Sequence, residues 1–191
     1  MKRIRTIDIA YISLMAALIV VCSWITLPMT IPFTLQTFAV FVSVGVLGVW
    51  KGTASVLVYL FMGLVGVPVF SGFKGGAGVL LGPTGGYIIG FVFSALVTGL
   101  IMKKFKSFAA SLLAMLAGLI VCYVFGTVWF MVVYSRGHEI TLGAAVSMCI
   151  VPYIIPDLAK ICVAAQVSAK VRRYLRAAED VKNVTTGGTD V

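Results

Sequence analysis

The sequence predicts an all-α integral membrane protein with six transmembrane helices and with both termini in the cytoplasm. Three observations lead to this fold class. Of the 191 residues, 61% are hydrophobic and 11% are charged, whereas soluble domains are roughly 45–50% apolar and about 25% charged. The mean hydropathy is +1.10. The apolar residues form long runs between short basic clusters, and at about 20 residues per span the chain has room for about five to seven helices and no separate soluble domain.

Six apolar runs are the expected helices. They cover residues 9–27, 37–50, 53–66, 87–102, 108–134 and 156–175. Pro28 and Pro32 end the first helix, and Lys51 with Gly52 forms a tight turn between the second and third, which are both shorter than a full span. A short helix at the outer surface is expected over 141–150. Strands are not expected, because no period-two alternation occurs and lipid tolerates only helices or closed barrels.

The basic residues set the orientation of these helices. With six crossings, most of the 15 Lys and Arg residues fall on one side of the membrane, and only Lys74 and Arg136 fall in loops on the other side. The residues on the basic side are Lys2, Arg3, Arg5, Lys51, Lys103, Lys104, Lys106, Lys170, Arg172, Arg173, Arg176 and Lys182. The positive-inside rule identifies that side as the cytoplasm, which predicts a multi-pass protein of the cell membrane. Residues 1–178 form the membrane domain, and the polar segment 179–191 is predicted to be disordered.

Several function classes are excluded by the sequence pattern. The net charge of +9 lies in the loop clusters, and no motif for reading or stacking bases accompanies it, so nucleic acid is not an expected partner. The G-x-x-x-x-G-K-[ST] phosphate loop is absent. The four cysteines lie in or beside apolar runs without metal-ligand spacing. No cluster of His, Cys or carboxylate groups suits catalysis, so the sequence predicts no enzyme, no metal and no cofactor.

Asp157 and Lys160 are the first candidate site. Their i, i+3 spacing places both side chains on one face of the last helix. An ionised group within a span costs a few kcal/mol or more, so such groups face a cavity or a partner. Two readings follow from the residues alone: a polar ligand site, or a neutral pair that fixes helix packing.

The glycine-rich loop over 67–87 is the second candidate. Its glycines allow close approach of the backbone to a ligand, and the N–H groups at Gly85 and Gly86, before the next helix, are suited to an anion such as a carboxylate. The alternative is a flexible external connector, against which the apolar side chains of the loop, such as Phe73, argue. A third segment, 28–37, is external and uncharged, and it adds Thr34 and Gln36 as plausible ligand contacts.

Together these segments resemble the BioY family, the biotin-binding S components of energy-coupling factor (ECF) transporters. The matching pieces are 32–37 (PFTLQT), 59–70 (YLFMGLVGVPVF), 82–87 (GPTGGY) and 152–160 (PYIIPDLAK). Four such pieces in this order, spread over nearly the whole chain, are quite specific. One departure is Tyr153, where the family pattern has phenylalanine.

The resemblance implies a six-helix S component that captures biotin from outside and delivers it inward. In that role Asp157 accepts from a ureido N–H of biotin. Lys160 either donates to the ureido carbonyl or holds Asp157 in place. Phe73, Tyr87 and Tyr123 would bury the ring, because ligand pockets are mostly apolar with few polar anchors.

The resemblance also implies partners. A separate transmembrane coupling subunit and two ATPase subunits would supply the energy, and membrane lipid would surround the helices. Ser13, Ala16 and Ala17 would form a small-residue docking face for the coupling subunit, since small residues permit close helix packing; packing within the chain's own bundle is the alternative. The rival functions are an S component for another vitamin and a structural or assembly protein of the membrane.

Overall fold

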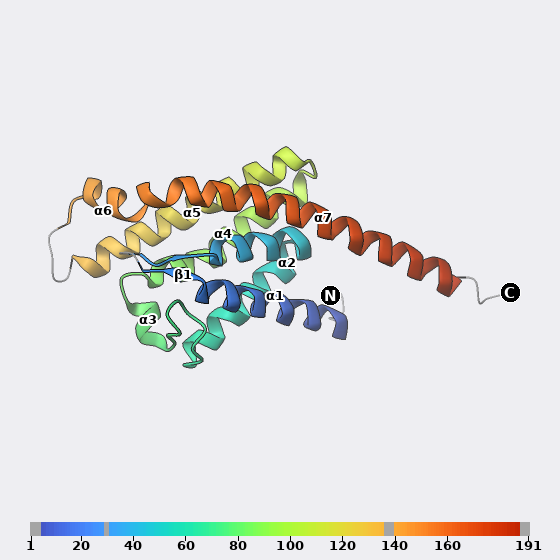
Figure 1. The fold of residues 1–191 in the computed structure, drawn as a ribbon, viewed down its shortest axis with the longest axis horizontal. Coiled ribbons are helices and arrows are strands. Elements are labelled where there is room, and N and C mark those ends of the chain that lie inside the picture. The colour runs from blue at the N-terminus through green and yellow to red at the C-terminus, as the bar shows by residue number, and fades with distance from the viewer. Residues whose placement is uncertain (1–4, 29–30, 136–139, 188–191) are drawn as a thin grey trace.

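A computed structural model describes residues 5–28, 31–135 and 140–187 of the chain. Figure 1 shows an elongated helical bundle, from which the end of the last helix projects. The long helices are α1 (Thr6–Trp24), α2 (Gln36–Leu64), α4 (Gly85–Lys104), α5 (Phe108–Tyr134) and α7 (Ile154–Gly187). The short elements are β1 (Thr26–Leu27), β2 (Phe33–Thr34), α3 (Ala77–Leu81), α6 (Leu142–Cys149) and a 3₁₀ turn at Val151–Tyr153. Within the described residues, five helical stretches are long and apolar enough to cross a membrane, the last of them being Leu142–Leu175.

Helix α2 contains a sharp reversal at Gly48. The backbone there has φ +78° and ψ 178°, a conformation that favours glycine. The two arms then pack so closely that a Cβ on Gly52 would lie 2.6 Å from the Cα of Val44. The arms on either side of Gly48 correspond to the predicted helices 37–50 and 53–66. The turn predicted at Lys51 and Gly52 therefore lies a few residues earlier, and Gly52 serves close packing instead.

A two-stranded antiparallel hairpin joins α1 to α2, so the prediction that strands are absent is wrong. Thr26 pairs with Thr34, and Leu27 pairs with Phe33. Each strand has only two residues, which is too short to produce a period-two pattern in the sequence. The chain enters this hairpin directly after Trp24, which is why α1 ends before the predicted boundary at residue 27.

The remaining helix boundaries follow local signals. Helix α5 has the predicted bounds, and the Ser107 hydroxyl caps it by accepting from the N–H of Ala110 at 3.1 Å. Helix α6 lies within the predicted segment 141–150 and begins after Thr141, whose hydroxyl caps it. Helix α7 continues to Gly187, although the sequence predicts disorder from residue 179. The Ala, Arg, Glu and Lys residues around that boundary are good helix formers, and residues 188–191 lie outside the described part.

Apolar side chains cover the outside of the bundle as well as its interior. One face of α5 presents residues at i, i+7, i+11, i+15 and i+19 that are each more than half exposed: Leu113, Ile120, Val124, Val128 and Val132. This spacing follows a single helical face. Such a continuous apolar stripe is typical of a helix that contacts lipid.

The start of α1, the projecting part of α7 and two reversals lie at the same end of the bundle. Figure 1 shows four features at the end of the bundle opposite the β-hairpin and α6. They are the start of α1, the reversal of α2, the connection from α4 to α5, and the point where α7 leaves the bundle. Lys51, Lys103, Lys104 and Lys106 belong to that end. The hairpin, α3 and α6 form the other end, where the largest group of buried aromatic side chains lies.

Candidate ligand-binding site

A cavity of about 360 Å³ opens at the hairpin end of the bundle, a volume within the range of small-molecule pockets. The hairpin, the 65–84 connection and helices α2, α4, α5 and α7 contribute to its wall. Its aromatic wall residues are Phe33, Phe70, Tyr87, Phe91, Tyr123 and Tyr153. The wall also holds polar groups, among them Asp157, Lys160 and Gln36, so the cavity is suited to a mainly apolar ligand with a few polar anchors.

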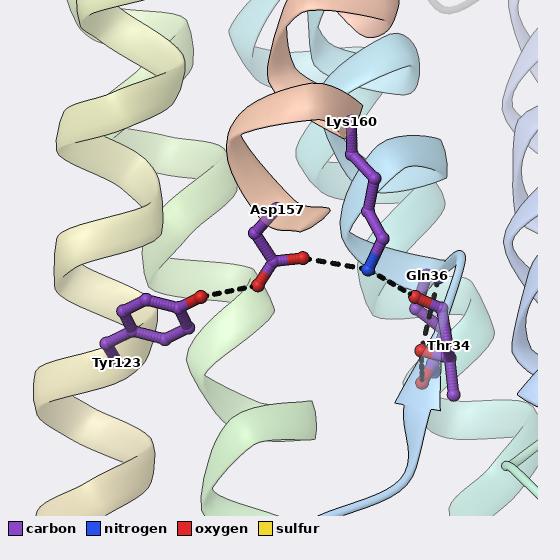
Figure 2. Close-up of polar contacts among 5 residues, drawn as sticks. All are labelled: Thr34, Gln36, Tyr123, Asp157 and Lys160. Atoms are coloured by element: carbon purple, nitrogen blue, oxygen red, sulfur yellow. Dashed lines mark hydrogen bonds and ion pairs between the residues drawn. The ribbon is translucent and has the colours of Figure 1, made fainter. Parts of the chain in front are cut away.

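Asp157 and Lys160 form a buried ion pair in this wall. The Lys160 Nζ lies 2.8 Å from Oδ1 of Asp157, and only 8% and 4% of the two residues are exposed. Pro156 and Asp157 belong to the first turn of α7, and the i, i+3 spacing brings the two side chains together as predicted. Figure 2 shows both side chains directed toward the hairpin and α5.

Lys160 has two further partners in the hairpin. Its Nζ donates to the backbone carbonyl of Thr34 at 2.7 Å, and it lies 3.8 Å from the centroid of the Phe33 ring. A desolvated cation over an aromatic face is stabilised by the ring quadrupole. The lysine thus connects α7 to β2 across 126 positions of sequence.

Tyr123 is the second hydrogen-bond partner of the Asp157 carboxylate. Its hydroxyl donates to Oδ2 of Asp157 at 2.6 Å, so each carboxylate oxygen accepts one hydrogen bond from the protein. An ionised carboxylate offers about four acceptor positions. About two positions on Asp157 therefore stay available for N–H donors of a ligand.

Thr34 and Gln36 belong to a second group of buried polar contacts next to the pair. The Thr34 hydroxyl donates to Oε1 of Gln36 at 3.0 Å and accepts from the Gln36 backbone N–H at 3.2 Å. The side-chain amide of Gln36 donates to the Tyr59 hydroxyl. These bonds fix the side chain of Gln36 at the cavity wall, where both predicted residues lie.

Tyr87 also lies where the sequence predicts it, at the cavity wall. Its side chain is 8% exposed, and its hydroxyl shares a 2.9 Å hydrogen bond with the Thr127 hydroxyl. Gly126 makes room for the ring, since a Cβ there would lie 2.2 Å from Cδ1 of Tyr87. Tyr87 is therefore a rigid, hydrogen-bonded wall residue.

Three predicted ligand residues are not among the cavity lining. A Cβ on Gly85 would lie 1.8 Å from the Leu80 carbonyl oxygen, and a Cβ on Gly86 would lie 2.2 Å from Cβ of Trp129. Both glycines thus permit close packing at the start of α4. Phe73 is 64% exposed and stacks on Trp24 with a ring-centroid distance of 5.0 Å.

Other wall residues were missed by the sequence reasoning. Tyr153 accepts from the N–H of Ile31 at 3.3 Å and donates to the Ile31 carbonyl, so it fixes the hairpin from the 3₁₀ turn that precedes α7. Phe33 faces Lys160, and Lys74 lies at the exposed part of the wall. Phe33 and Tyr153 lie inside the motif segments 32–37 and 152–160, and this position in the motifs could have identified them as wall residues. Lys74 is the single cation of the glycine-rich loop.

The predicted docking face on α1 is divided by the structure. Ser13 and Ala17 are exposed, whereas Ala16 is only 2% exposed and packs inside the bundle. Adjacent helical positions differ by about 100° in direction, so Ala16 turns inward when Ala17 faces out. Ala16 therefore packs inside the bundle and does not belong to the exposed face that was predicted for docking.

Comparison with known proteins now adds to this geometry. The sequence model of the BioY family matches residues 1–177. The chain belongs to the BioY family. This confirms the resemblance drawn from the four motif segments.

Individual BioY relatives agree with this assignment. The biotin transporter BioY of Thermotoga maritima is 45% identical over 166 residues, which cover 82% of this chain and 90% of that protein. A probable biotin transporter BioY of Pyrococcus horikoshii is 44% identical over 85 residues, 44% of this chain and 52% of that protein. The crystal structure of the S-component for biotin from an ECF-type ABC transporter superposes with a TM-score of 0.78 at 27% identity, covering 91% of this chain and 95% of that one. The chain is thus a multi-pass membrane protein with the S-component fold.

Proposed function

We propose that this chain is the substrate-binding S component of an ECF-type importer, that its substrate is biotin, and that it has no catalytic activity of its own. The observation that carries the proposal is the buried Asp157–Lys160 pair in the wall of a cavity with six aromatic side chains. Membership of the BioY family supports it, as do the relative named a biotin transporter and the S-component for biotin with the same fold.

Asp157 is suited to recognise the ureido group of biotin. A ureido group offers two N–H donors, and the carboxylate keeps about two acceptor positions beside its bonds to Lys160 and Tyr123. A hydrogen bond from a neutral N–H to an ionised carboxylate is charge-assisted and therefore strong. The aromatic wall would cover the fused rings of the ligand.

Lys160 orients the site rather than donating to the ligand. An ammonium group has three N–H donors, of which one is used by Asp157 and another by the Thr34 carbonyl. The Phe33 ring occupies a further side of the ammonium group. This distribution favours the role in which Lys160 holds Asp157 and the hairpin in place.

The valerate carboxylate of biotin would point toward Lys74. This lysine lies at the exposed part of the cavity wall, away from the buried pair, where a negative chain end can stay solvated. A surface ion pair contributes little energy, so Lys74 would guide the carboxylate rather than dominate affinity.

Six membrane crossings with cytoplasmic termini are part of the proposal. At 1.5 Å per residue the α2 arms over 36–47 and 49–64 are roughly 18 and 24 Å long, against a hydrocarbon core of ~30 Å. They therefore count as two short crossings joined at Gly48. The basic residues at the Gly48 end favour the cytoplasm on that side of the cell membrane. Lys2, Arg3 and Arg136, which the sequence analysis also counted among the basic residues on the two sides of the membrane, lie outside the described residues.

A coupling subunit with two ATPase subunits would drive uptake. Ser13 and Ala17 are exposed on α1 beside Leu14, which is 61% exposed. Such a surface permits a partner helix to approach closely, and we assign it to the coupling subunit.

Equilibrium dialysis of the purified chain against biotin and a panel of other vitamins tests the proposal. Biotin should bind tightly and the other vitamins should not compete. Selective binding of a different vitamin would identify an S component of other specificity. Absence of binding to every vitamin would instead favour a structural or assembly protein.

A further inference from the structure

Tyr59 is a buried side chain that lies behind the wall of the ligand cavity. Its exposed fraction is 0%, and it is not among the residues that line the cavity. It belongs to the second arm of α2 and begins the motif segment 59–70, but the proposed function gives it no role. A buried tyrosine hydroxyl usually has a hydrogen-bond partner, so that partner indicates what the residue does.

The partner of Tyr59 is a cavity residue. Its hydroxyl accepts a hydrogen bond from the side-chain amide of Gln36, which lines the cavity and is only 5% exposed. The two residues lie 23 positions apart on the two arms of α2, and the reversal at Gly48 brings the arms together. Tyr59 therefore holds Gln36 from behind the cavity wall.

The amide of Gln36 keeps one donor for a ligand. A side-chain amide has two N–H donors and one carbonyl oxygen. The oxygen accepts from the Thr34 hydroxyl at 3.0 Å, and one N–H is donated to Tyr59. Within the described part of the chain the second N–H has no partner. Figure 2 shows Gln36 beside Thr34, on the hairpin side of the Lys160 ammonium group, so this N–H belongs to the same polar part of the wall as the buried ion pair.

The ring of Tyr59 supports an apolar wall residue. It meets the ring of Phe70 edge-on, with a centroid distance of 5.6 Å and an interplanar angle of 79°, and Phe70 lines the cavity. Gly63 lets Phe70 approach, because a Cβ there would overlap the end of the Phe70 ring. The contact with Phe70 uses the ring and the contact with Gln36 uses the hydroxyl, so phenylalanine at position 59 would remove only the second.

We propose that Tyr59 is a positioning residue of the ligand site, which directs the second N–H of Gln36 toward an acceptor of the bound ligand. For biotin that acceptor is the ureido carbonyl, so the inference rests on the proposed function. Lys160 directs two of its donors to Asp157 and to the Thr34 carbonyl, and the ureido carbonyl therefore needs another donor. Gln36 supplies it, and without the Tyr59 hydroxyl its amide is less firmly held.

A double-mutant cycle of Tyr59→Phe and Gln36→Leu tests this role, with biotin affinity measured by equilibrium dialysis of the purified full chain. Tyr59→Phe should bind biotin about three- to tenfold more weakly, the effect of one hydrogen bond between neutral groups. In the Gln36→Leu background the same change should alter the affinity less than about twofold, because Tyr59 then has no amide to position. An equal loss in both backgrounds would overturn the proposal, since a purely structural effect does not depend on Gln36.

Ser43→Ala is the matched control. Ser43 is another fully buried residue of α2, and its hydroxyl donates to the Ala39 carbonyl of the same helix at 2.8 Å. It does not line the cavity, so the variant should keep the affinity of the unchanged protein. A loss as large as that of Tyr59→Phe would show that any buried hydroxyl of α2 has this effect, and would reject the specific role. Circular dichroism and gel filtration check that each variant is folded.

A biotin analogue with a thiocarbonyl in place of the ureido carbonyl tests which acceptor is involved. Sulfur accepts hydrogen bonds more weakly than oxygen, so Tyr59→Phe should weaken the binding of this analogue less than that of biotin. An equal effect on both ligands would contradict the assignment to the carbonyl. If Tyr59→Phe does not fold, Gln36→Leu decides, because it must weaken biotin more than the analogue.

Failure of the proposed function would look different. The unchanged protein would then bind no biotin, whereas failure of the present inference leaves that binding intact and makes the two substitutions additive. Without biotin binding, thermal unfolding of the single and double variants still tests the contact between Tyr59 and Gln36. Additive shifts in unfolding temperature would overturn it.

Discussion

Replacing Asp157 by asparagine tests the ligand site most directly. The side chain keeps its shape but loses its charge, and one acceptor oxygen becomes an NH₂ donor. The amide oxygen must then face Lys160, because that ammonium group can only donate. The new NH₂ group faces the Tyr123 hydroxyl, which has to turn round and accept. A ligand N–H therefore meets about half of the former acceptor positions and no negative charge.

The expected loss follows from these contacts. A hydrogen bond to a charged group contributes about 1.5–3 kcal/mol, and each ~1.4 kcal/mol is a factor of ten in affinity. Biotin should therefore bind about ten- to more than a hundredfold more weakly to Asp157→Asn. Some stability is lost as well, since Lys160 stays buried without its counter-ion, although the Thr34 carbonyl and the Phe33 ring still face it.

Equilibrium dialysis with labelled biotin measures the affinity, and thermal unfolding in detergent reports the fold. Asp8→Asn is the matched control, because it breaks the Asp8–Lys51 pair of the same type at the other end of the bundle. That variant should keep the affinity of the unchanged protein.

The double change Asp157→Leu/Lys160→Leu separates recognition from packing. Replacing a buried ion pair by apolar residues of similar size is often neutral or stabilising, so the double variant should fold. It should nevertheless lose biotin. A folded double variant that binds biotin as tightly as the unchanged protein would refute the assignment of the site.

Three further predictions concern the rest of the chain. Ala17→Trp should abolish uptake in cells while the purified chain still binds biotin, whereas Ala16→Trp should fail to fold because that position is buried; equal folding defects in both would reject the docking face. Single cysteines at Lys104 and Leu142, placed in a chain without other cysteines, should react with impermeant thiol reagents from opposite sides of the membrane. Reaction from one side would contradict the six crossings. Gly48→Ala should lower the free energy of unfolding by about 1–3 kcal/mol, since φ +78° with ψ 178° is a conformation that is essentially restricted to glycine, and an unchanged unfolding temperature would argue against the observed reversal.

Local features of the sequence were sufficient to predict a helical multi-pass membrane protein and the charged pair. Apolar runs of membrane length report helices directly, because the hydrocarbon core fixes how long a span must be. The i, i+3 spacing of Asp157 and Lys160 likewise fixes a shared helix face. The order of four short motifs was specific enough to identify the BioY family.

Only the tertiary structure decided which residues surround the pair. The contact of Lys160 with the Thr34 carbonyl and that of Tyr123 with Asp157 join elements 126 and 34 positions apart, and no local pattern encodes such distances. The role of two glycines was likewise not predictable from local sequence. The sequence predicts Gly85 and Gly86 as part of a ligand-binding loop, yet glycine is needed there because Leu80 and Trp129 pack against these positions.

The same distinction explains the errors in the helix and docking predictions. The sequence determines that α2 must be interrupted, since Gly48, Lys51 and Gly52 all disfavour a single buried span. Which glycine takes the positive φ depends on how the two arms pack, and the approach of Gly52 to Val44 selects Gly48. Small residues on α1 permit close packing on every face, but the position of the neighbouring helices alone determines that Ala16 is buried and Ala17 exposed. Residue type sets what contact is possible, and the arrangement of the helices sets which contact forms.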